Sequence, residues 1–363
     1  MQLFRLLPKV LSQTINTSQL KKIFTILSVL AILTSCAKKS NDLTSQKPVL
    51  SKDISLSVAG QNENKPPLIT PSDSYNYLGF GYDVTDKFND EASVRANVIN
   101  TSAYAASGSQ RINIGTSTEG AARTIEANDA AELSARFSSA FNETNGSVLF
   151  GNTLYGLFPG TNVTDKKYVY GYYSDYWIYK SYKIFYDQNV NNFLTDNFKR
   201  DILSLTAQEL VSKYGTHVLT RINLGRRFDI FYQAEALTKD KRSIIKEGLQ
   251  YALKSVFGLS TVENLINKSS DLESLNANGS AKVYYKSYGG DISKLKTQTV
   301  NKRTMLNITD WLHSANVANA SFIGPLENGL VSLDKFIDDS TKKAEVNLYI
   351  KQYLASKTVT LSN

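Results

Sequence analysis

The chain has 363 residues, with 41 Lys or Arg, 33 Asp or Glu, a single cysteine and a formal net charge of +8. Four basic residues lie in the first 35 positions, so 37 basic and 33 acidic residues remain beyond them, and this mild excess gives no case for nucleic acid as a partner. One cysteine also excludes an internal disulfide, so the remaining chain of about 300 residues must fold around a hydrophobic core alone, which is an ample length.

The first 35 residues have the composition of a leader that directs export. Lys21 and Lys22 precede an apolar run over residues 23–33, and no acidic residue occurs in the segment. The run is too short for a transmembrane helix, which needs about 20 residues, but it is typical of the apolar region of a signal peptide. Residues 1–35 are therefore predicted to be removed on export.

Residues 33–36 read Leu-Thr-Ser-Cys, which resembles a lipobox: an aliphatic residue, two small residues and then cysteine. Small residues admit a peptidase to the bond, and the thiol of Cys36 accepts diacylglycerol. We expect lipidation at Cys36 and attachment to a bacterial outer membrane, at the cell surface or on released vesicles. The alternative is a lone thiol after an ordinary signal peptide, but a single leftover cysteine rarely falls at such a site by chance.

Residues 36–74 predict a flexible, lipid-anchored tether. They are rich in Ser, Asn, Lys and Gln, poor in aromatic residues, and contain Pro66, Pro67 and Pro71. Such a composition cannot bury enough apolar surface to offset the entropy lost on ordering. The folded domain is expected over residues 75–357.

The first part of this domain contains several short elements. Residues 75–82 alternate aromatic residues with glycine and predict a strand or a tight turn. A helix is expected over residues 129–140, with a strand that opens at residues 135–138 as the alternative. Apolar residues punctuated by glycine predict another strand over residues 147–158.

Residues 168–186 give the clearest strand signal, because tyrosines and β-branched residues suit a pleated surface. One very long strand and two shorter strands with a turn at Ser174 and Asp175 both fit the pattern, since strands usually have about five or six residues. The tyrosines are predicted to cover a sheet, and sugar-binding platforms are the alternative interpretation.

A helix is expected over residues 196–213. Thr206 and Glu209 have the spacing of a capping box, in which hydroxyl and carboxylate each satisfy a free backbone N–H, so the helix is expected to restart at Ala207.

The remaining elements follow from hydrophobic periodicity. Alternation predicts strands over residues 217–236 and 282–288, and apolar residues on one side predict a helix over residues 240–257 that ends at Gly258. Two helices are expected within residues 333–356. This order of elements is typical of an α+β chain with a mainly antiparallel sheet.

Four short motifs occur in one order along this domain. The sequence Tyr214-Gly215-Thr216-His217 follows the tyrosine-rich segment, and Tyr-Gly-Gly-Asp stands at residues 288–291. Trp-Leu-His-Ser at residues 311–314 and Phe-Ile-Gly-Pro-Leu at residues 322–326 come next. Together these motifs resemble the MACPF (membrane attack complex/perforin) family, and the resemblance covers about residues 75–355.

The resemblance implies a MACPF fold: a bent, four-stranded, mainly antiparallel sheet flanked by two helical clusters. In pore-forming members the clusters open into amphipathic β-hairpins, and neighbouring subunits close a large barrel. The first cluster would lie at about residues 187–213 and the second at about residues 259–281.

The resemblance also implies roles for single residues. Gly289 and Gly290 would form a hinge beside the last strand, where glycine accepts backbone angles that other residues resist. Gly215 would permit a tight entry into a strand and Tyr214 would pack under the bend. Thr216 and His217 would form hydrogen bonds locally.

Two departures from the family pattern bear on function. Residues 224–226 read Leu-Gly-Arg where the family often has two glycines, and the expected second cluster is polar and alternates poorly. Two hypotheses therefore stand. The first is a pore-forming, membrane-attack toxin directed at bacteria, which binds membrane lipid and an envelope receptor and forms a homo-oligomeric ring. The second is a non-lytic surface or adhesion lipoprotein that keeps the fold.

Catalysis has no support in the sequence. No Gly-x-Ser-x-Gly, phosphate-loop or His-Glu-x-x-His motif occurs, and His217 and His313 have no partner at metal-ligand spacing. We therefore expect no enzymatic activity, no metal and no cofactor, and we interpret His217 as a structural histidine.

Overall fold

The computed structural model describes residues 57–61, 69–141, 148–158, 160–185, 188–236, 241–259, 280–300 and 303–362. All of them lie in one compact unit, Leu50–Asn363. The predicted signal peptide, Cys36 and most of the predicted tether lie outside the described residues.

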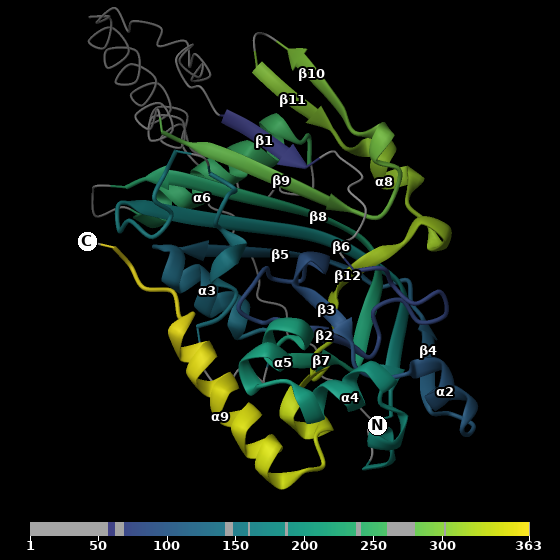
Figure 1. Cartoon of the computed structure of the whole chain (residues 1–363). Helices are drawn as coiled ribbons and strands as arrows, with labels where there is room; N and C mark the ends of the chain where they lie inside the picture. Colours follow the sequence, from purple (N-terminus) through teal and green to yellow (C-terminus); the bar gives the residue numbers. More distant parts are fainter. Residues whose placement is uncertain are drawn as a thin grey trace, which may run out of the picture. The chain divides into compact units, whose positions relative to one another are not determined.

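The main sheet is built mainly from six strands that occupy four side-by-side positions, and every hydrogen-bonded pair among these strands is antiparallel (Figure 1). Its strands are β4 (Ile112–Thr116), β5 (Gly120–Ala127), β6 (Tyr168–Ile184), β8 (Arg221–Glu235), β9 (Lys282–Tyr288) and β12 (Ser321–Pro325). The long strands β6 and β8 pair at the centre, β4 and β5 share the position outside β6, and β9 and β12 share the position outside β8. The predicted four-stranded sheet is confirmed, with each outer strand divided in two.

The tyrosine-rich segment forms one strand of 17 residues, β6. Ser174 and Asp175 pair with β8 without a turn, so the alternative of two shorter strands is wrong. Side chains alternate between the two faces: Tyr170 and Tyr172 are buried on one face, and Val169 and Tyr173 are buried on the other. The tyrosines therefore cover both faces of the sheet, as aromatic residues in a central strand do.

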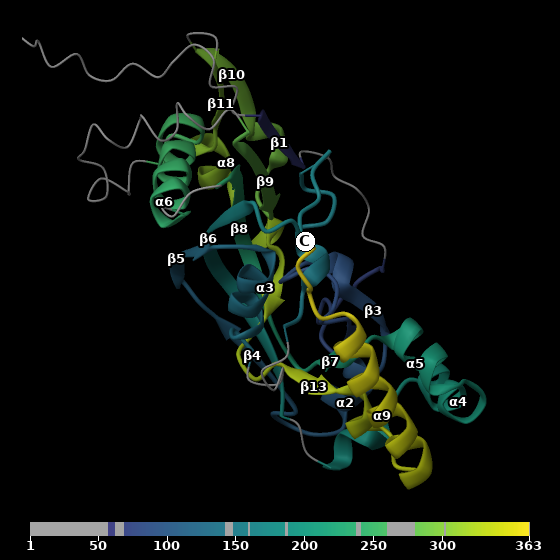
Figure 2. The same ribbon diagram turned by 90° about the vertical axis from the view of Figure 1, so that its left-hand side faces the viewer.

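Each face of the main sheet carries its own helix. Helix α3 (Ala130–Ser138) packs on the face that contains Tyr170 and Tyr172. Helix α6 (Lys241–Tyr251), continued by a π-helical turn over Ala252–Val256, packs on the opposite face with Trp311 of α8 (Thr309–Ser314). Figure 2 shows α3 and α6 on either side of the strands.

A second sheet of four short strands lies beside the main one. Its order is β13 (Leu330–Ser332), β7 (His217–Leu219), β2 (Phe80–Tyr82) and β3 (Val94–Asn97). Helices α4 (Asp196–Ser204), α5 (Ala207–Tyr214) and α9 (Ser340–Ser356) lie next to this sheet in both views (Figures 1 and 2). The predicted capping box is present, because Thr206 and Glu209 exchange hydrogen bonds at the start of α5.

The remaining elements are short. They are α2 (Thr101–Ala106), the hairpin β10 (Lys296–Val300) and β11 (Arg303–Asn307), the strand β1 (Ser57–Gln61), and 3₁₀ turns at Glu91–Ser93, Gly151–Thr153, Gln188–Phe193, Ile292–Lys294, Val317–Asn319 and Leu333–Phe336.

Three expectations differ from the structure. Residues 148–158 form turns and a 3₁₀ helix rather than a strand, and Phe150 has a φ of 62°, which no strand residue adopts. Within the predicted tether, Ser57–Gln61 form β1 against β9. The side-chain hydroxyl of Tyr77 also donates to the carbonyl of Ile69 (3.0 Å), so the ordered chain includes residues before position 75.

Candidate functional site

Two long connections leave the main sheet at the same end, which we call the helical end. Strand β5 ends at Ala127 opposite Tyr170, and β6 begins at Tyr168 opposite Glu235 of β8. Strand β9 begins opposite Gln233 of β8. The connection over residues 128–167 therefore joins β5 to β6, the connection over residues 236–281 joins β8 to β9, and the two leave neighbouring strands of the sheet.

The segment over residues 187–213 lies at the opposite end of the sheet. It follows the last residue of β6, Ile184, and precedes β8, whose Arg221 pairs with Lys183. A hairpin from this segment could not continue the strand pairs that leave the helical end. Its interpretation as the first insertion cluster is therefore wrong, because the connection that starts and ends beside residues 236–281 is the one over residues 128–167. The polar residues 260–279 of the expected second cluster lie outside the described residues.

Helix α3 is held to the sheet by apolar side chains four residues apart. Leu133, Phe137 and Phe141 are buried, and full burial of such side chains contributes about 1.5–3 kcal/mol each. The Phe137 ring stacks on Phe88 with centroids 4.4 Å apart and meets Tyr172 edge-on at 5.0 Å. Asp129 caps the helix locally, because its carboxylate accepts from the Glu132 amide.

Helix α6 uses the same spacing on the other face. Leu249, Leu253 and Phe257 are buried, and Phe257 packs on Phe228 and Tyr285. Close packing depends on a glycine of β6: a Cβ on Gly171 would lie 3.3 Å from the Leu249 Cβ. The helix passes into a π-helical turn at Ala252–Val256, a feature that is frequent at functional sites.

The expected hinge residues lie where β9 leaves the sheet. Gly289 and Gly290 have φ values of 66° and 68°, in the left-handed region that favours glycine. A Cβ on Gly289 would lie 2.4 Å from the carbonyl oxygen of Gly225, and the Trp311 indole donates to the Gly289 carbonyl at 2.9 Å. At Gly225 the partner of β8 changes from β9 to β12. A glycine of β8 and the glycine that follows β9 therefore meet here, and the pairing of β6 with β8 is irregular at the same level, between Ile178 and Lys180; we call this point the bend.

Arg226 follows Gly225 and ties β8 to β6. Its Nη1 lies 2.5 Å from Asp175 Oδ1, and its guanidinium lies over the Trp177 ring. The two charged side chains are 14% and 29% exposed, so solvent screens the pair only in part. The arginine that departs from the family pattern thus forms a cross-strand contact at the bend.

A buried ionic cluster lies next to the bend. The Arg227 side chain donates to Asp229 Oδ2 (3.0 Å) and to the carbonyl of Asn89 (2.8 Å). The ammonium of Lys286 on β9 pairs with Asp90, to which Tyr288 also donates. Burial opposes the charge on Asp90, but Lys286 outweighs it and holds the pKa of Asp90 below its ordinary value. The loop at residues 89–90 is therefore clamped onto β8 and β9.

The Tyr-Gly-Thr-His motif fastens the second sheet rather than the hinge. The Tyr214 hydroxyl donates to Asp201 (2.6 Å), and its ring packs edge-on against Phe198. Gly215 has a φ of 76°, and a Cβ there would lie 2.6 Å from the carbonyl carbon of Tyr82. Tyr214 therefore packs against helix α4 beside the second sheet, and not against Gly289 or Gly290.

Thr216 and His217 complete the contacts of the motif. The Thr216 amide and hydroxyl both donate to the carbonyl of Tyr82, and the Val84 amide donates to the hydroxyl. His217 Nδ1 lies 3.0 Å from the Thr216 hydroxyl. Burial lowers the pKa of His217 from 6.5 to about 4, against the opposing effect of Asp83 and Asp334. A neutral, buried imidazole of this kind serves packing and hydrogen bonding.

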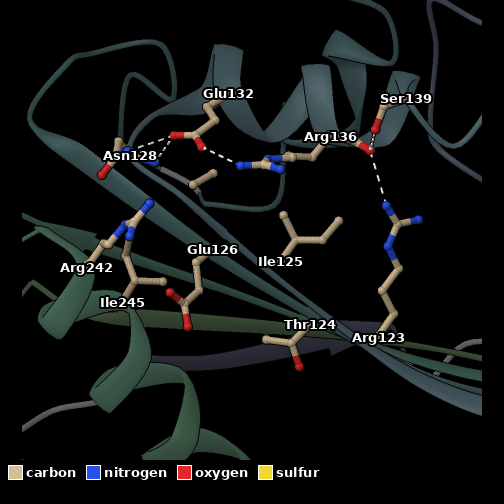
Figure 3. A pocket seen from close by; sticks show the side chains of 11 residues that line it. Arg123, Thr124, Ile125, Glu126, Asn128, Glu132, Arg136, Ser139, Arg242 and Ile245 are labelled. Atoms are coloured by element: carbon tan, nitrogen blue, oxygen red, sulfur yellow. Dashed lines mark hydrogen bonds and ion pairs between the residues drawn. The ribbon is translucent and has the colours of Figure 1, made fainter.

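A cleft of about 500 Å³ follows the outer edge of β5 between the two helices (Figure 3). Residues 123–128 line its floor, and Glu132 and Arg136 of α3 and Arg242 of α6 line its walls. Glu132 accepts from both nitrogens of Asn128 and pairs with Arg136, while Arg123 donates to the Arg136 carbonyl. The edge of β5 is thus polar and open along this cleft.

The described residues contain no group of three or more His, Cys, Asp or Glu side chains placed to hold a metal ion. In the same residues, no helix combines the length and the apolar character that a membrane crossing requires.

Comparison with known proteins defines the class. The family model described as the MAC/Perforin domain matches residues 163–361. The chain belongs to the MACPF family, whose members are pore formers or binding proteins.

Solved structures agree on the fold. A MAC/Perforin-domain protein from Bacteroides thetaiotaomicron superposes with a TM-score of 0.61 at 18% identity, over 81% of this chain and 64% of that one. GNIP1Aa from Chromobacterium piscinae gives a TM-score of 0.60 at 12% identity, over 79% of this chain and 57% of that one. The chain thus spans less than two thirds of either structure. No curated protein matches it in sequence.

Proposed function

We propose that this protein is a lipid-anchored, pore-forming toxin that attacks cell envelopes, with other bacteria as its candidate targets. In the proposed mechanism, copies assemble side by side and the main sheet opens at its bend. Residues 128–167 and 236–281 then extend the strands of the helical end into the membrane as two β-hairpins. Each connection exceeds the about 20 residues that two transmembrane strands require.

The observation that carries the proposal is a double periodicity in residues 131–141. Five of the six odd positions are apolar, namely Ala131, Leu133, Ala135, Phe137 and Phe141, whereas four of the five even positions are polar, namely Glu132, Ser134, Arg136 and Ser138. Apolar residues at every fourth position form one face of a helix and also one face of a strand. This segment of eleven residues therefore suits α3 now and a membrane-spanning strand, which needs about nine to eleven residues, after opening.

Residues 249–259 repeat the pattern in part in the second connection. Leu249, Tyr251, Leu253, Phe257 and Leu259 occupy odd positions, whereas the even positions hold both polar residues, Gln250 and Lys254, and apolar ones, Ala252 and Val256. Alternation of this kind gives a transmembrane barrel its lipid face and its water-filled face.

Burial of the same apolar side chains in the folded helices and in the proposed barrel explains how the segments can change from one state to the other. Leu133, Phe137, Leu249 and Leu253 are buried on the sheet now and would face lipid in the barrel, so their apolar surface stays out of water. Only a closed barrel satisfies the backbone of such strands in lipid. The hairpins of one copy cannot close a barrel, which is why the proposal requires a ring of copies with membrane lipid and an envelope receptor as partners.

The proposed anchor is diacylglycerol on Cys36, which would keep the protein on an outer membrane or on released vesicles. The leader and the lipobox support it. Metabolic labelling with a fatty acid should label the wild type and not a Cys36→Ala variant, and equal labelling of both would contradict it.

A disulfide that locks α6 to the sheet tests pore formation. Gly171→Cys and Leu249→Cys would place two Cβ atoms about 3.3 Å apart, near the separation that a disulfide needs. The oxidised double variant is expected to bind membranes but to release no dye from loaded vesicles or cells, and reduction is expected to restore release. Each single cysteine variant is the control. Unchanged dye release by the oxidised double variant would contradict insertion of residues 236–281.

The second candidate function is non-lytic binding at the cell surface. It is favoured by the contacts across the bend, the Arg226–Asp175 pair and the Lys286–Asp90 pair, which oppose opening. Electron microscopy of the wild type on vesicles separates the two functions. Rings and dye release support the pore, whereas stable binding without either supports the surface-binding protein.

A further inference from the structure

A second cavity of about 500 Å³ lies next to the bend, and we call it the bend cavity. Of its lining residues, only Arg123 also lines the cleft of Figure 3. Its walls come from distant parts of the chain: β6, β8, the loop at residues 88–89, and β12 with the residues that follow it. Its volume is within the range of small-molecule sites.

Three residues of these walls carry buried polar atoms that no group in the described part of the chain pairs with. They are the Oδ1 atoms of Asn89 and Asn223 and the Nη2 atom of Arg227. An unpaired polar group in a protein interior is destabilising, and most such groups have a partner. Three of them around one cavity indicate a site that a polar ligand completes.

The Arg227 guanidinium is held on its other sides. Its Nε donates to Asp229, and its Nη1 donates to the carbonyls of Asn89 and Ile323. The guanidinium carbon lies 3.9 Å from the centre of the Tyr288 ring, and the side chain is 3% exposed. The Nη2 group is therefore a donor in a fixed position, which loses little entropy when a ligand binds.

The Phe-Ile-Gly-Pro-Leu motif at residues 322–326 forms one wall of the bend cavity. Gly324 lets the Asn89 side chain come close, because a Cβ on Gly324 would lie 2.7 Å from the Asn89 Oδ1. Three further residues of the motif line the cavity, namely Ile323, Pro325 and Leu326. This motif therefore shapes the cavity and positions one of its amides.

The charges around the bend cavity balance. Its lining contains Arg123 and Arg227 together with Glu119 and Glu327, and Arg227 is also paired with Asp229. Such a lining has no excess of positive charge that would attract a phosphate or a carboxylate. The amides and the guanidinium instead offer acceptors and donors together, which suits hydroxyl groups, because a hydroxyl both donates and accepts.

We propose that the bend cavity binds a neutral saccharide. The Nη2 of Arg227 donates to one sugar hydroxyl, and the amides of Asn89 and Asn223 bond to others; a half-turn of an amide exchanges its donor and its acceptor. The half-buried ring of Tyr176, which lines the cavity, packs on the apolar C–H face of the sugar. The site does not depend on pore formation, so it holds for both candidate functions.

Binding of defined sugars to the purified chain tests the site. Saturation-transfer NMR would use galactose, mannose, rhamnose and N-acetylglucosamine, with glucuronate and glucose 6-phosphate as charged comparisons, and an array of neutral glycans would present the same sugars as chain ends. At least one neutral sugar is expected to bind, free or as a chain end, about tenfold more tightly than the charged comparisons. Binding of no neutral sugar in either form would overturn the site, and tighter binding of the charged sugars would overturn the ligand class.

Asn223→Leu tests the position of the site, and Asn97→Leu is its matched control. Both asparagines have a buried, unpaired Oδ1, but Asn97 lies in β3 and is not part of the cavity lining. Both variants are expected to keep or raise the melting temperature, because each removes an unpaired oxygen. Only Asn223→Leu is expected to weaken sugar binding, by about tenfold, and binding equal to that of the wild type would overturn the proposal.

Tyr176→Ala tests the same site without a change to a buried polar group, so it serves if Asn223→Leu does not fold. Its control is Tyr155→Ala, because Tyr155 is 52% exposed and does not line the cavity. Tyr176→Ala is expected to weaken sugar binding by about tenfold, and the control is expected to leave it unchanged. Equal sugar binding by the two variants would overturn the site.

Discussion

The helical end of the main sheet and the second sheet are held together by different kinds of contact. Helix α3 rests on apolar side chains such as Phe137, and its cap and ion pair, Asp129 with Glu132 and Glu132 with Arg136, are local. The second sheet is tied by directional bonds between distant residues, since Thr216 bonds to both Tyr82 and Val84.

The difference shows which part can move. Apolar contacts are non-directional, so α3 and α6 can leave the sheet for another apolar environment without orphaned polar groups. Separation of Thr216 from β2 would instead leave buried donors and acceptors unpaired, which costs about 1–3 kcal/mol per group. The second sheet is thus suited to act as a fixed base in the proposed opening of the helical end.

The largest expected effect comes from one phenylalanine in each region. Phe137→Ala and Phe198→Ala should each lower the free energy of unfolding by about 3–5 kcal/mol, because both rings are fully buried. At a temperature where both variants are folded, only Phe137→Ala should also reduce dye release per folded molecule, since Phe137 would face lipid. Urea unfolding and dye-release assays measure the two quantities, and equal release by both variants would contradict the distinction.

Gly215→Ala should cost about 3 kcal/mol of unfolding free energy, from the left-handed backbone and from the close approach to Tyr82. Gly156→Ala separates these causes, because Gly156 has a φ of 83° and nothing lies within 4 Å of a Cβ there. The control should lose only about 1–2 kcal/mol. Equal losses in thermal unfolding would show that the motif does not fasten the second sheet by close packing.

The protonation of His217 should make stability depend on pH. Its pKa in the folded chain, about 4, is below the ordinary value of 6.5, so the unfolded chain binds the proton more tightly. Stability from the neutral imidazole is complete above pH 6.5 and is lost as the pH falls towards about 4, by about 2–3 kcal/mol. Unfolding at pH 7 and pH 4.5 measures this. His217→Gln should flatten the dependence and His313→Gln, at an exposed site, should not.

The smallest expected effect on stability is at Arg226. Arg226→Gln should change the free energy of unfolding by less than about 1 kcal/mol, because the pair with Asp175 is partly exposed. It should nevertheless speed dye release, since it removes a tie across the bend. A double-mutant cycle with Asp175→Asn checks the assignment, and additive effects on the release rate would show that the pair does not act at the bend.

Local patterns were sufficient to predict several parts of the fold. The aromatic alternation of β6, the capping box at Thr206 and the paired glycines after β9 are each determined by neighbouring residues. Edge strands were harder: β5 begins Gly-Ala-Ala and is exposed there, so it has neither the composition nor the alternation of a buried strand. Strand β1 has no local signal, because only its pairing with β9 makes it a strand.

The location of the proposed insertion segments could not follow from local patterns either. Residues 196–213 are mostly helical, as residues 130–138 are, and the difference is the end of the sheet at which each connection lies. That end is fixed by pairs such as Ala127 with Tyr170, which join distant positions. Likewise, Tyr214 and Gly289 belong to motifs of one family, but Tyr214 lies beside the second sheet and Gly289 lies at the end of β9 in the main sheet.

The most direct test of the account is the periodicity of residues 131–141 in membranes. An environment-sensitive fluorophore would be attached to single cysteines at successive positions, and its emission recorded in solution and on vesicles. The account predicts that odd positions such as 133, 135 and 137 shift to an apolar environment while the even positions stay aqueous. A period near 3.6 residues on membranes, or no change from the soluble protein, would contradict the conversion of α3 into a transmembrane strand.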